Sequence, residues 1–205
     1  MIILHLATRN PGKIRELNRI LASLPGELRA APPSVEMPDV AETGATFAAN
    51  ARLKAEALSR LQDGWVVADD SGLVVDALDG EPGVRSARYG EPERLGLDDA
   101  GRRRLLLERM IAVPDAERSA RFVCALALAR GGETVAEFEG KCEGTIAFAE
   151  RGSAGFGYDP IFVFPAADRT FGEMTDAEKD RHSHRANALW SLAAYLTGLP
   201  PAARY

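Results

Sequence analysis

Two adjacent carboxylates, Asp69 and Asp70, interrupt an apolar run in the stretch "WVVADDSGLVVDAL". Carboxylates at a strand end are typical of ligand and metal sites in α/β folds, because the strand fixes side chains that the turn exposes. Successive strand residues point to opposite faces, so the two aspartates should not share one role. Burying them would be costly without a cation, and Mg²⁺ suits one or two carboxylates plus substrate phosphates. The alternative is an Asx-type turn, with Ser71 and Gly72 closing a hairpin.

A second candidate is "LATRNPGK", where a strand passes through a tight turn into a helix. Asn10 can cap this helix with Pro11 at its first position, and Lys13 lies in the first turn. A helix N-terminus suits phosphate, and a cation there opposes the helix dipole, which hints that an anion is expected. The Walker pattern is absent. The alternative is an ordinary capped helix with a solvated lysine.

A third candidate is "AETGATFAAN", in which Glu42 lies just ahead of a predicted helix. Glu42 could be a ligand, or a surface carboxylate that favours the helix dipole. Asn50 and Lys54 are four residues apart on that helix, and the sequence does not decide whether they face solvent or a cleft.

Two later segments combine flat or charged side chains with flexible backbone. In "GSAGFGYDPIF" the glycines allow close approach to a ligand, while Phe156 and Tyr158 offer flat surfaces or simply fill a core. In "EKDRHSHRANAL" basic side chains gather just before the last predicted helix, as a site that binds an anion or a keto oxygen would need. An ordinary basic start of a helix is the alternative.

The elements that must position these residues alternate along the chain. Periodicity predicts strands over residues 2–7, 28–31, 65–68, 74–78, 121–129, 134–139 and 161–164. It predicts helices after Asn10, over residues 46–61, around Leu105, and at the end of the chain after the capping-box pattern "TDAE". This order predicts a mixed α/β sheet flanked by helices. The hairpin-like strand spacing in the second half indicates two lobes with a central cleft, in one domain over residues 1–205.

Composition excludes several classes of protein. The 205 residues are 46% hydrophobic with a net charge of −5, which argues against a nucleic-acid-binding surface. Two cysteines, Cys124 and Cys142, predict buried free thiols. No signal region and no apolar run of roughly 20 residues is present, so we expect a soluble, cytoplasmic protein without membrane contact. The basic cluster at residues 102–104 is interpreted as a solvated helix face.

Five ordered blocks carry a resemblance to a known family: "LATRNPGK", "ETGATFAANARLKA", "VVADDSGLVVDALDGEPGVRSARY", "GFGYDPIF" and "MTDAEKDRHSHRANAL". In this order and over nearly the full length, they resemble the inosine triphosphate pyrophosphatase family, the Ham1/RdgB-like noncanonical purine nucleotide pyrophosphatases. The resemblance implies an elongated mixed α/β fold, a homodimer, and one or more Mg²⁺ ions per subunit. It also implies hydrolysis of ITP, dITP and XTP to the monophosphate and pyrophosphate.

The resemblance also implies roles for particular residues. Asp70 corresponds to the proton acceptor, and Glu42 and Asp70 correspond to the metal-site carboxylates. The residues that correspond to substrate contacts are Thr8, Arg9, Asn10, Pro11, Gly12, Lys13, Ser71, Phe156, Gly157, Tyr158, Asp159, Lys179, His184 and Arg185. Asp69 stays open between a carboxylate that supports the metal site and a further metal contact, and His182 receives no assigned role.

Three alternatives to this function are weighed. A Maf-like pyrophosphatase, acting on pyrimidine or modified nucleotides, shares the general layout, but its motif pattern is not seen here. A noncatalytic nucleotide-binding module would be expected to lose Asp70 or Lys13, and both are present. A nucleic-acid-binding module would need a basic face that the charge balance does not indicate.

Overall fold

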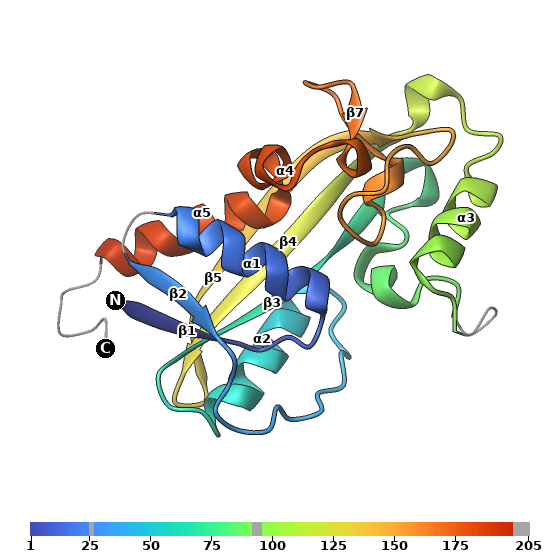
Figure 1. The fold of residues 1–205 in the computed structure, drawn as a ribbon. Coiled ribbons are helices and arrows are strands. Elements are labelled where there is room, and N and C mark those ends of the chain that lie inside the picture. The colour runs from blue at the N-terminus through green and yellow to red at the C-terminus, as the bar shows by residue number, and fades with distance from the viewer. Residues whose placement is uncertain (25–26, 92–95, 199–205) are drawn as a thin grey trace. The chain divides into compact units, whose positions relative to one another are not determined.

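Seven strands pair into one mixed sheet in a computed structural model that describes residues 1–24, 27–91 and 96–198. The strand order is β2-β1-β3-β4-β5-β6-β7. β1 is parallel to β2 and β3, whereas β6 is antiparallel to β5 and β7. The predicted mixed α/β class is therefore confirmed (Figure 1).

The strands are β1 (Ile2–Leu6), β2 (Leu28–Ala31), β3 (Trp65–Val75), β4 (Ser119–Arg130), β5 (Glu133–Ile146), β6 (Phe162–Phe164) and β7 (Arg169–Thr170). The α-helices are α1 (Pro11–Ser23), α2 (Phe47–Ser59), α3 (Asp99–Arg109), α4 (Asp176–His182) and α5 (His184–Gly198). Short 3₁₀ segments are η1 (Asp76–Leu78), η2 (Gly83–Arg88), η3 (Asp115–Glu117), η4 (Asp159–Ile161) and η5 (Phe171–Glu173).

The described residues divide into two compact units. Unit 1 contains Met1–Asp70, Cys124–Gly140 and the described residues from His184 onward, and unit 2 contains the described residues of Ser71–Val123 and Lys141–Ser183. Strands β3, β4 and β5 contribute residues to both units. The expectation of one domain with a cleft stays a prediction.

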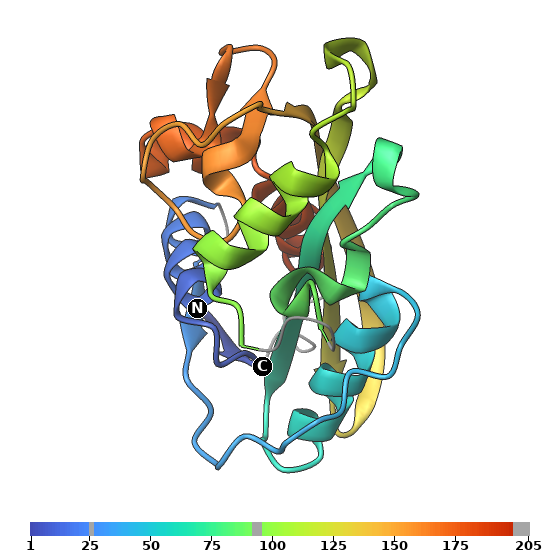
Figure 2. The same ribbon diagram turned by 90° about the vertical axis from the view of Figure 1, so that its right-hand side faces the viewer.

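In unit 1 the sheet is covered on both faces, which explains the almost continuous apolar runs of β3 and β4. Trp65 and Val67 belong to the apolar cluster formed with α1 and α5. Val66 and Ala68, on the opposite face, belong to a cluster formed with α2. Figures 1 and 2 show α1 and α2 on opposite sides of these strands. The pleat thus sends alternate β3 residues to different helices.

The predicted helix starts are largely confirmed. Asn10 caps α1 by accepting hydrogen bonds from the N–H groups of Gly12 and Lys13, with Pro11 at the first position. Thr175 begins α4 with a complete capping box. The last helix differs slightly, because α5 begins at His184 and so includes His184 and Arg185 in its first turn.

The predicted interruption at Asp69 and Asp70 is wrong, and so is the hairpin alternative. β3 runs without a break from Trp65 to Val75, so both aspartates lie inside a strand. Ser86 in unit 2 supports the strand beyond them: its hydroxyl accepts a hydrogen bond from the Leu73 N–H at 3.0 Å and donates to the Gly83 carbonyl at 2.6 Å. The turn instead falls at η1.

Other boundaries also differ from expectation. β5 is eight residues longer than its predicted range of 134–139 and ends at Ile146, and η4 leaves only Phe162–Phe164 for β6. Unit 2 has its own apolar core, which includes Phe122, Phe162 and Phe171. Both cysteines are buried free thiols, as predicted.

The interpretation of residues 102–104 as a solvated helix face is wrong for Arg102 and Arg103, whose side chains are 18% and 13% exposed. Arg102 pairs with Asp99, and the Arg103 guanidinium donates to the Gly157 carbonyl and pairs with Glu150. Arg104 is exposed, as expected. Arg103 is held by partners that are distant in sequence, and helical periodicity alone does not predict them.

Replacing Gly72 tests the close contact beside β3. A Cβ on Gly72 would lie 2.2 Å from Ser86 Oγ and 2.7 Å from the Gly83 carbonyl oxygen. We expect Gly72→Ala to lower the free energy of unfolding by about 1–3 kcal/mol through overpacking, measured by urea denaturation. Gly198→Ala is the control, because nothing lies within 4 Å of a Cβ built there. A Gly72→Ala protein as stable as the wild type would contradict the contact.

Candidate functional site

Asp69 anchors one group of charges in unit 1. Its Oδ1 lies 2.6 Å from Lys13 Nζ, and its Oδ2 accepts a hydrogen bond from Arg185 Nε at 2.7 Å. The Cys124 thiol donates to the same Oδ2 at 3.3 Å. Arg185 also pairs with Glu16, and both side chains are buried. Asp69 is therefore a buried counter-ion that holds Lys13.

The interactions within this group keep Asp69 and Arg185 charged. Burial opposes the negative charge of Asp69, but Arg185 and Lys13 outweigh burial and hold its pKa well below the usual range. Burial likewise opposes the charge of Arg185, yet Asp69 and Glu16 raise its pKa. Burial raises the pKa of the Cys124 thiol, with a further contribution from Asp69, so this thiol stays protonated and can donate.

Asp70 anchors a second group, on the other face of β3. Lys54 Nζ lies 2.9 Å from Asp70 Oδ1 and 2.8 Å from Glu42 Oε1. Asn50 Nδ2 donates to Asp70 Oδ2 at 3.3 Å, while Asn50 Oδ1 accepts from the Gly44 N–H at 2.8 Å. Asn50 and Lys54 therefore both face Asp70 rather than solvent.

The pKa shifts here follow from burial and from the shared lysine. Burial raises the pKa of Asp70, although Lys54 and Lys13 act in the opposite direction. Burial would lower the pKa of Lys54, but the charges of Asp70 and Glu42 outweigh it and raise that pKa. Lys54 therefore remains an ammonium group and offsets the repulsion between two carboxylates.

The prediction that Asp69 and Asp70 point to opposite faces of the strand is confirmed. Asp69 contacts side chains from α1 and α5, whereas Asp70 contacts side chains from α2. The pleat alone requires this, because neighbouring strand residues face opposite ways.

Glu42 and Asp70 are the carboxylates that fit a hard divalent cation. Both approach one nitrogen within 2.9 Å, so their oxygens already converge on a single positive charge. Mg²⁺ commonly takes one or two carboxylates and completes its shell with water and substrate phosphates. Among residues 1–24, 27–91 and 96–198, no group of three or more His, Cys, Asp or Glu side chains forms a metal site.

The other residues of the first loop lie around the α1 cap. Asn10 N–H donates to Thr8 Oγ1 at 3.2 Å, and Arg9 donates to the Met37 carbonyl. The N–H groups of Gly12 and Lys13 are already engaged by the Asn10 side chain, and Pro11 has no N–H. The positive groups of this loop are therefore the Lys13 ammonium and the exposed Arg9 guanidinium.

In unit 2, Asp159 organises the predicted base-binding segment. Its Oδ2 accepts hydrogen bonds from the Phe156 N–H at 2.8 Å and from Lys179 Nζ at 2.6 Å. Lys179 Nζ also lies 5.2 Å from the centre of the Phe156 ring. Tyr158 is buried, and its hydroxyl donates to the Ser86 carbonyl at 2.9 Å. Phe156 is half-buried while Tyr158 fills the core, so the two aromatic side chains differ in role.

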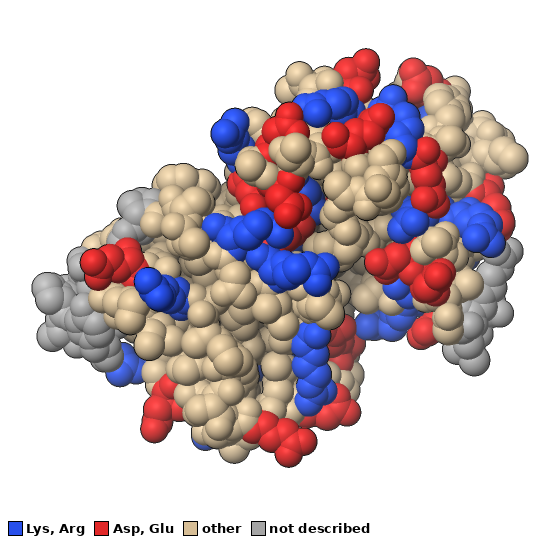
Figure 3. Space-filling model, in the orientation of Figure 1, with Lys and Arg blue, Asp and Glu red and all other residues tan. Residues whose placement is uncertain are grey.

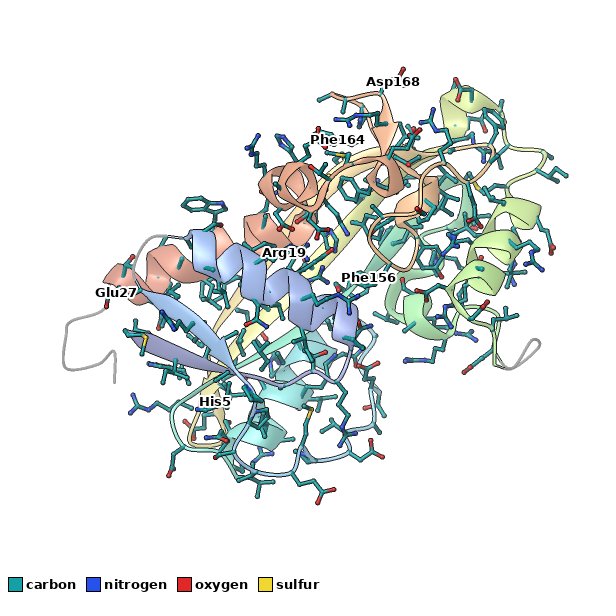
Figure 4. The ribbon with its side chains drawn as sticks, viewed as in Figure 1. His5, Arg19, Glu27, Phe156, Phe164 and Asp168 are labelled. Carbon is teal, nitrogen blue, oxygen red and sulfur yellow. The ribbon has the colours of Figure 1, made fainter. Side chains whose placement is uncertain are left out.

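The remaining predicted residues are placed as follows. Ser71 is half-buried in β3, directly after Asp70. His184 is buried in the first turn of α5. His182, which had no assigned role, is exposed and stacks on Phe164 with ring centres 4.9 Å apart; Figure 4 labels Phe164.

Sequence reasoning missed Glu16 and did not resolve Lys54. The i, i+4 spacing of Asn50 and Lys54 was a usable signal, since both could serve one strand carboxylate. Glu16 lies within the buried face of α1, and its partner Arg185 comes from α5, far away in the sequence.

Removing the charge of Asp69 should destabilise the protein in a pH-dependent way. Asp69→Asn leaves Lys13 and Arg185 facing a neutral amide, and breaking such a buried pair costs about 3–5 kcal/mol. The folded-state pKa is depressed, so the contribution of Asp69 is complete above the unfolded-state value of about 3.9 and is lost as pH falls below it. The difference from wild type should therefore shrink below about pH 4.

Urea denaturation from pH 7 to pH 3 measures this difference, with the exposed Asp63→Asn as control. Equal stability of Asp69→Asn and wild type at pH 7 would contradict the buried counter-ion.

Comparison with known proteins gives the chain a family. The model of the Ham1 family matches residues 4–195. The dITP/XTP pyrophosphatase of Gloeobacter violaceus is 50% identical over 192 residues, which are 94% of this chain and 93% of the relative. The dITP/XTP pyrophosphatase of Bacillus subtilis is 42% identical over 191 residues, which are 93% and 95% of the two chains.

Solved structures agree with the sequence relatives. A HAM1 protein from Coxiella burnetii matches with a TM-score of 0.84 and 38% identity, covering 97% of this chain and 100% of that one. A nucleoside-triphosphatase/dITP/XTP pyrophosphatase from Mycobacterium abscessus matches with a TM-score of 0.72 and 42% identity, covering 93% and 98%. The resemblance carried by the five sequence blocks is confirmed, and the chain belongs to the Ham1 family.

Proposed function

We propose that this protein hydrolyses noncanonical purine nucleoside triphosphates (ITP, dITP and XTP) to the monophosphate and pyrophosphate. The relatives named dITP/XTP pyrophosphatase support this substrate class. The observation that carries the proposal is the pair of charge groups on β3, in which Lys13 is held by Asp69, and Asp70 lies beside Lys54 and Glu42. Such a group combines positive charge for phosphates with a carboxylate for water.

In the proposed reaction, water attacks the α-phosphorus and the bond to the β-bridging oxygen breaks, so pyrophosphate leaves. Asp70 orients the water or accepts its proton. Burial raises the pKa of Asp70, which makes its carboxylate a stronger base than an exposed aspartate. Lys13 stabilises charge that builds on the leaving group, and Asp69 and Arg185 fix Lys13 so that little reorganisation is needed.

Glu42 and Asp70 are proposed to hold Mg²⁺, with one or more ions per subunit. When bound, the ion would polarise phosphoryl oxygens and offset the negative charge of the triphosphate. Lys54 already keeps the two carboxylates together despite their like charge. This convergence of Glu42 and Asp70 on one positive charge supports the proposed cation site.

The segment Phe156, Gly157, Tyr158 and Asp159 is proposed to bind the purine base, with Lys179 and His184 as further contacts. A donor directed at a 6-keto oxygen would be left unpaired by the 6-amino group of adenine, and such sites discriminate by up to about 10⁴–10⁵. Thr8, Arg9, Asn10, Pro11, Gly12 and Ser71 stay proposed triphosphate or substrate contacts. For Arg185 we propose an indirect part, because it contacts Asp69 and Glu16.

Partner and location also stay predictions. The resemblance implies a homodimer, and composition predicts a cytoplasmic protein that binds neither nucleic acid nor membrane. Acidic and basic side chains are intermixed on the face drawn in Figure 3. This mixture does not favour binding of a nucleic-acid phosphate backbone on that face. Within the described part of the chain, no helix is both long and apolar enough to span a bilayer.

A nucleotide panel tests the proposed function. Purified protein with Mg²⁺ is incubated with ITP, XTP, dITP, ATP, GTP and dTTP, and pyrophosphate and phosphate are scored separately. We expect pyrophosphate from the inosine and xanthine nucleotides, and little product from the others. Release of phosphate alone would overturn the proposal. A preference for dTTP would favour the Maf-like alternative, and binding without turnover would favour a noncatalytic module.

Replacing Asp70 tests the proposed proton acceptor. Asp70→Asn retains the shape and a hydrogen-bonding oxygen but removes the base and one metal ligand, so kcat should fall by about 10³-fold or more. The fold should persist, as judged by circular dichroism. Asp63→Asn, an exposed change of the same chemistry, should leave kcat unchanged. Turnover of Asp70→Asn near the wild-type value would remove Asp70 from this role.

A further inference from the structure

Two side chains of α3 hold the peptide groups on either side of Gly157 in unit 2. The Gly157 N–H donates to Asp99 Oδ2 at 2.9 Å, and the Gly157 carbonyl accepts from Arg103 Nη1 at 2.8 Å. Asp99 and Arg103 are four residues apart, so they lie on one face of the helix. Figure 4 labels Phe156 on this loop, and Figure 1 labels α3. The peptide groups before and after Gly157 are thus both held by side chains of the same helix.

Gly157 needs this constraint. Its φ of 60° lies in the left-handed region, and no atom outside its immediate neighbours lies within 4 Å of a Cβ built there. Side-chain packing therefore does not restrict it, and glycine has the largest conformational freedom of any residue. The hydrogen bonds from α3 replace the missing steric restriction.

The helix that supplies these bonds is itself firmly placed. Leu105 and Leu106, within α3, and Met110, directly after it, are buried in the unit 2 core. Asp99 is further held by Arg102. Burial opposes the charge of Asp99, but hydrogen bonds from Arg102 and from the Gly157 N–H outweigh it and lower its pKa. An ionised, oriented acceptor therefore faces the Gly157 N–H.

Arg103 is placed in a way that stability alone does not favour. Its Nη2 pairs with Glu150 at 3.0 Å, yet its buried Nε has no hydrogen-bond partner among the described residues. A buried donor without a partner is destabilising. An apolar side chain would avoid that cost, but it could not hold the Gly157 carbonyl.

Gly157 lies between Phe156, whose ring is near Lys179, and Tyr158, whose hydroxyl is bound to Ser86. We propose that Asp99 and Arg103 are positioning residues, which set the orientation of residues 156–158 and thereby the preference for the base of the nucleotide. The inference rests on the base-binding role proposed for that segment.

Inhibition of dITP hydrolysis by IMP, the ribose analogue of the product dIMP, and by pyrophosphate separates base binding from phosphate binding, because IMP carries the base and pyrophosphate does not. Arg103→Met should raise the KM for dITP and the inhibition constant of IMP by about tenfold, the effect of losing 1.4 kcal/mol. The inhibition constant of pyrophosphate should not change, and kcat should stay within about threefold of wild type. The selectivity for dITP over dATP should fall.

Arg104→Met is the matched control, because Arg104 is the exposed neighbour on the same helix. Arg103→Lys should recover part of the IMP affinity, since an ammonium group can still donate to the Gly157 carbonyl. Asp99→Ala provides a second route to the same readout if Arg103→Met fails to fold.

Three outcomes are decisive. IMP inhibition of Arg103→Met and Asp99→Ala at the wild-type level would overturn the inference. Equal weakening of IMP and pyrophosphate inhibition would also overturn it, because that pattern indicates general loss of structure. Failure of the wild type to release pyrophosphate from dITP would instead overturn the proposed function, and it is seen before any variant is made.

Discussion

Two adjacent carboxylates are buried in the middle of one strand, and the arrangement of unit 1 depends on how their charges are compensated. Asp69 and Asp70 are 1% and 6% exposed, and a buried carboxylate is costly unless a cation or hydrogen-bond donors face it. The pleat of the strand directs the two carboxylates to opposite faces, so each is compensated by different partners. Lys13 of α1 and Arg185 of α5 compensate Asp69 on one face, while Lys54 of α2 compensates Asp70 on the other. The three helices that pack their apolar faces on the sheet, α1, α2 and α5, therefore also supply the charges that pair with the two aspartates.

Buried ion pairs seldom add much stability compared with apolar residues of similar size, so stability is a poor reason for this network. Catalysis is a better one, because preoriented charges need no reorganisation when a reacting phosphate develops charge. The apolar packing of α2 helps here. Ala51 and Ala55 are fully buried against β3 and β4, and such small side chains allow α2 to approach closely enough for Lys54 and Asn50 to reach Asp70.

In unit 2, polar contacts hold a glycine-containing loop in one conformation. Tyr158 is tied to the Ser86 carbonyl, Asp159 pairs with Lys179, and α3 holds both sides of Gly157. Ser86 also supports the strand after Gly72. The glycines allow the backbone to take shapes that other residues would resist, and surrounding polar contacts then select one of those shapes.

The sequence by itself determined what depends on near neighbours: the caps at Asn10 and Thr175, the apolar faces of α1 and α2, the free buried cysteines, and the mixed α/β class. Five ordered blocks also sufficed for the family. Only the tertiary structure decided that β3 continues through Asp69 and Asp70, that Lys54 turns inward, and that Arg103 is not a solvated residue. Each of these depends on partners far away in the chain, such as Arg185 for Asp69, 116 residues later. Local propensity favours a turn at two polar residues, and distant cations made a buried strand the lower-energy choice.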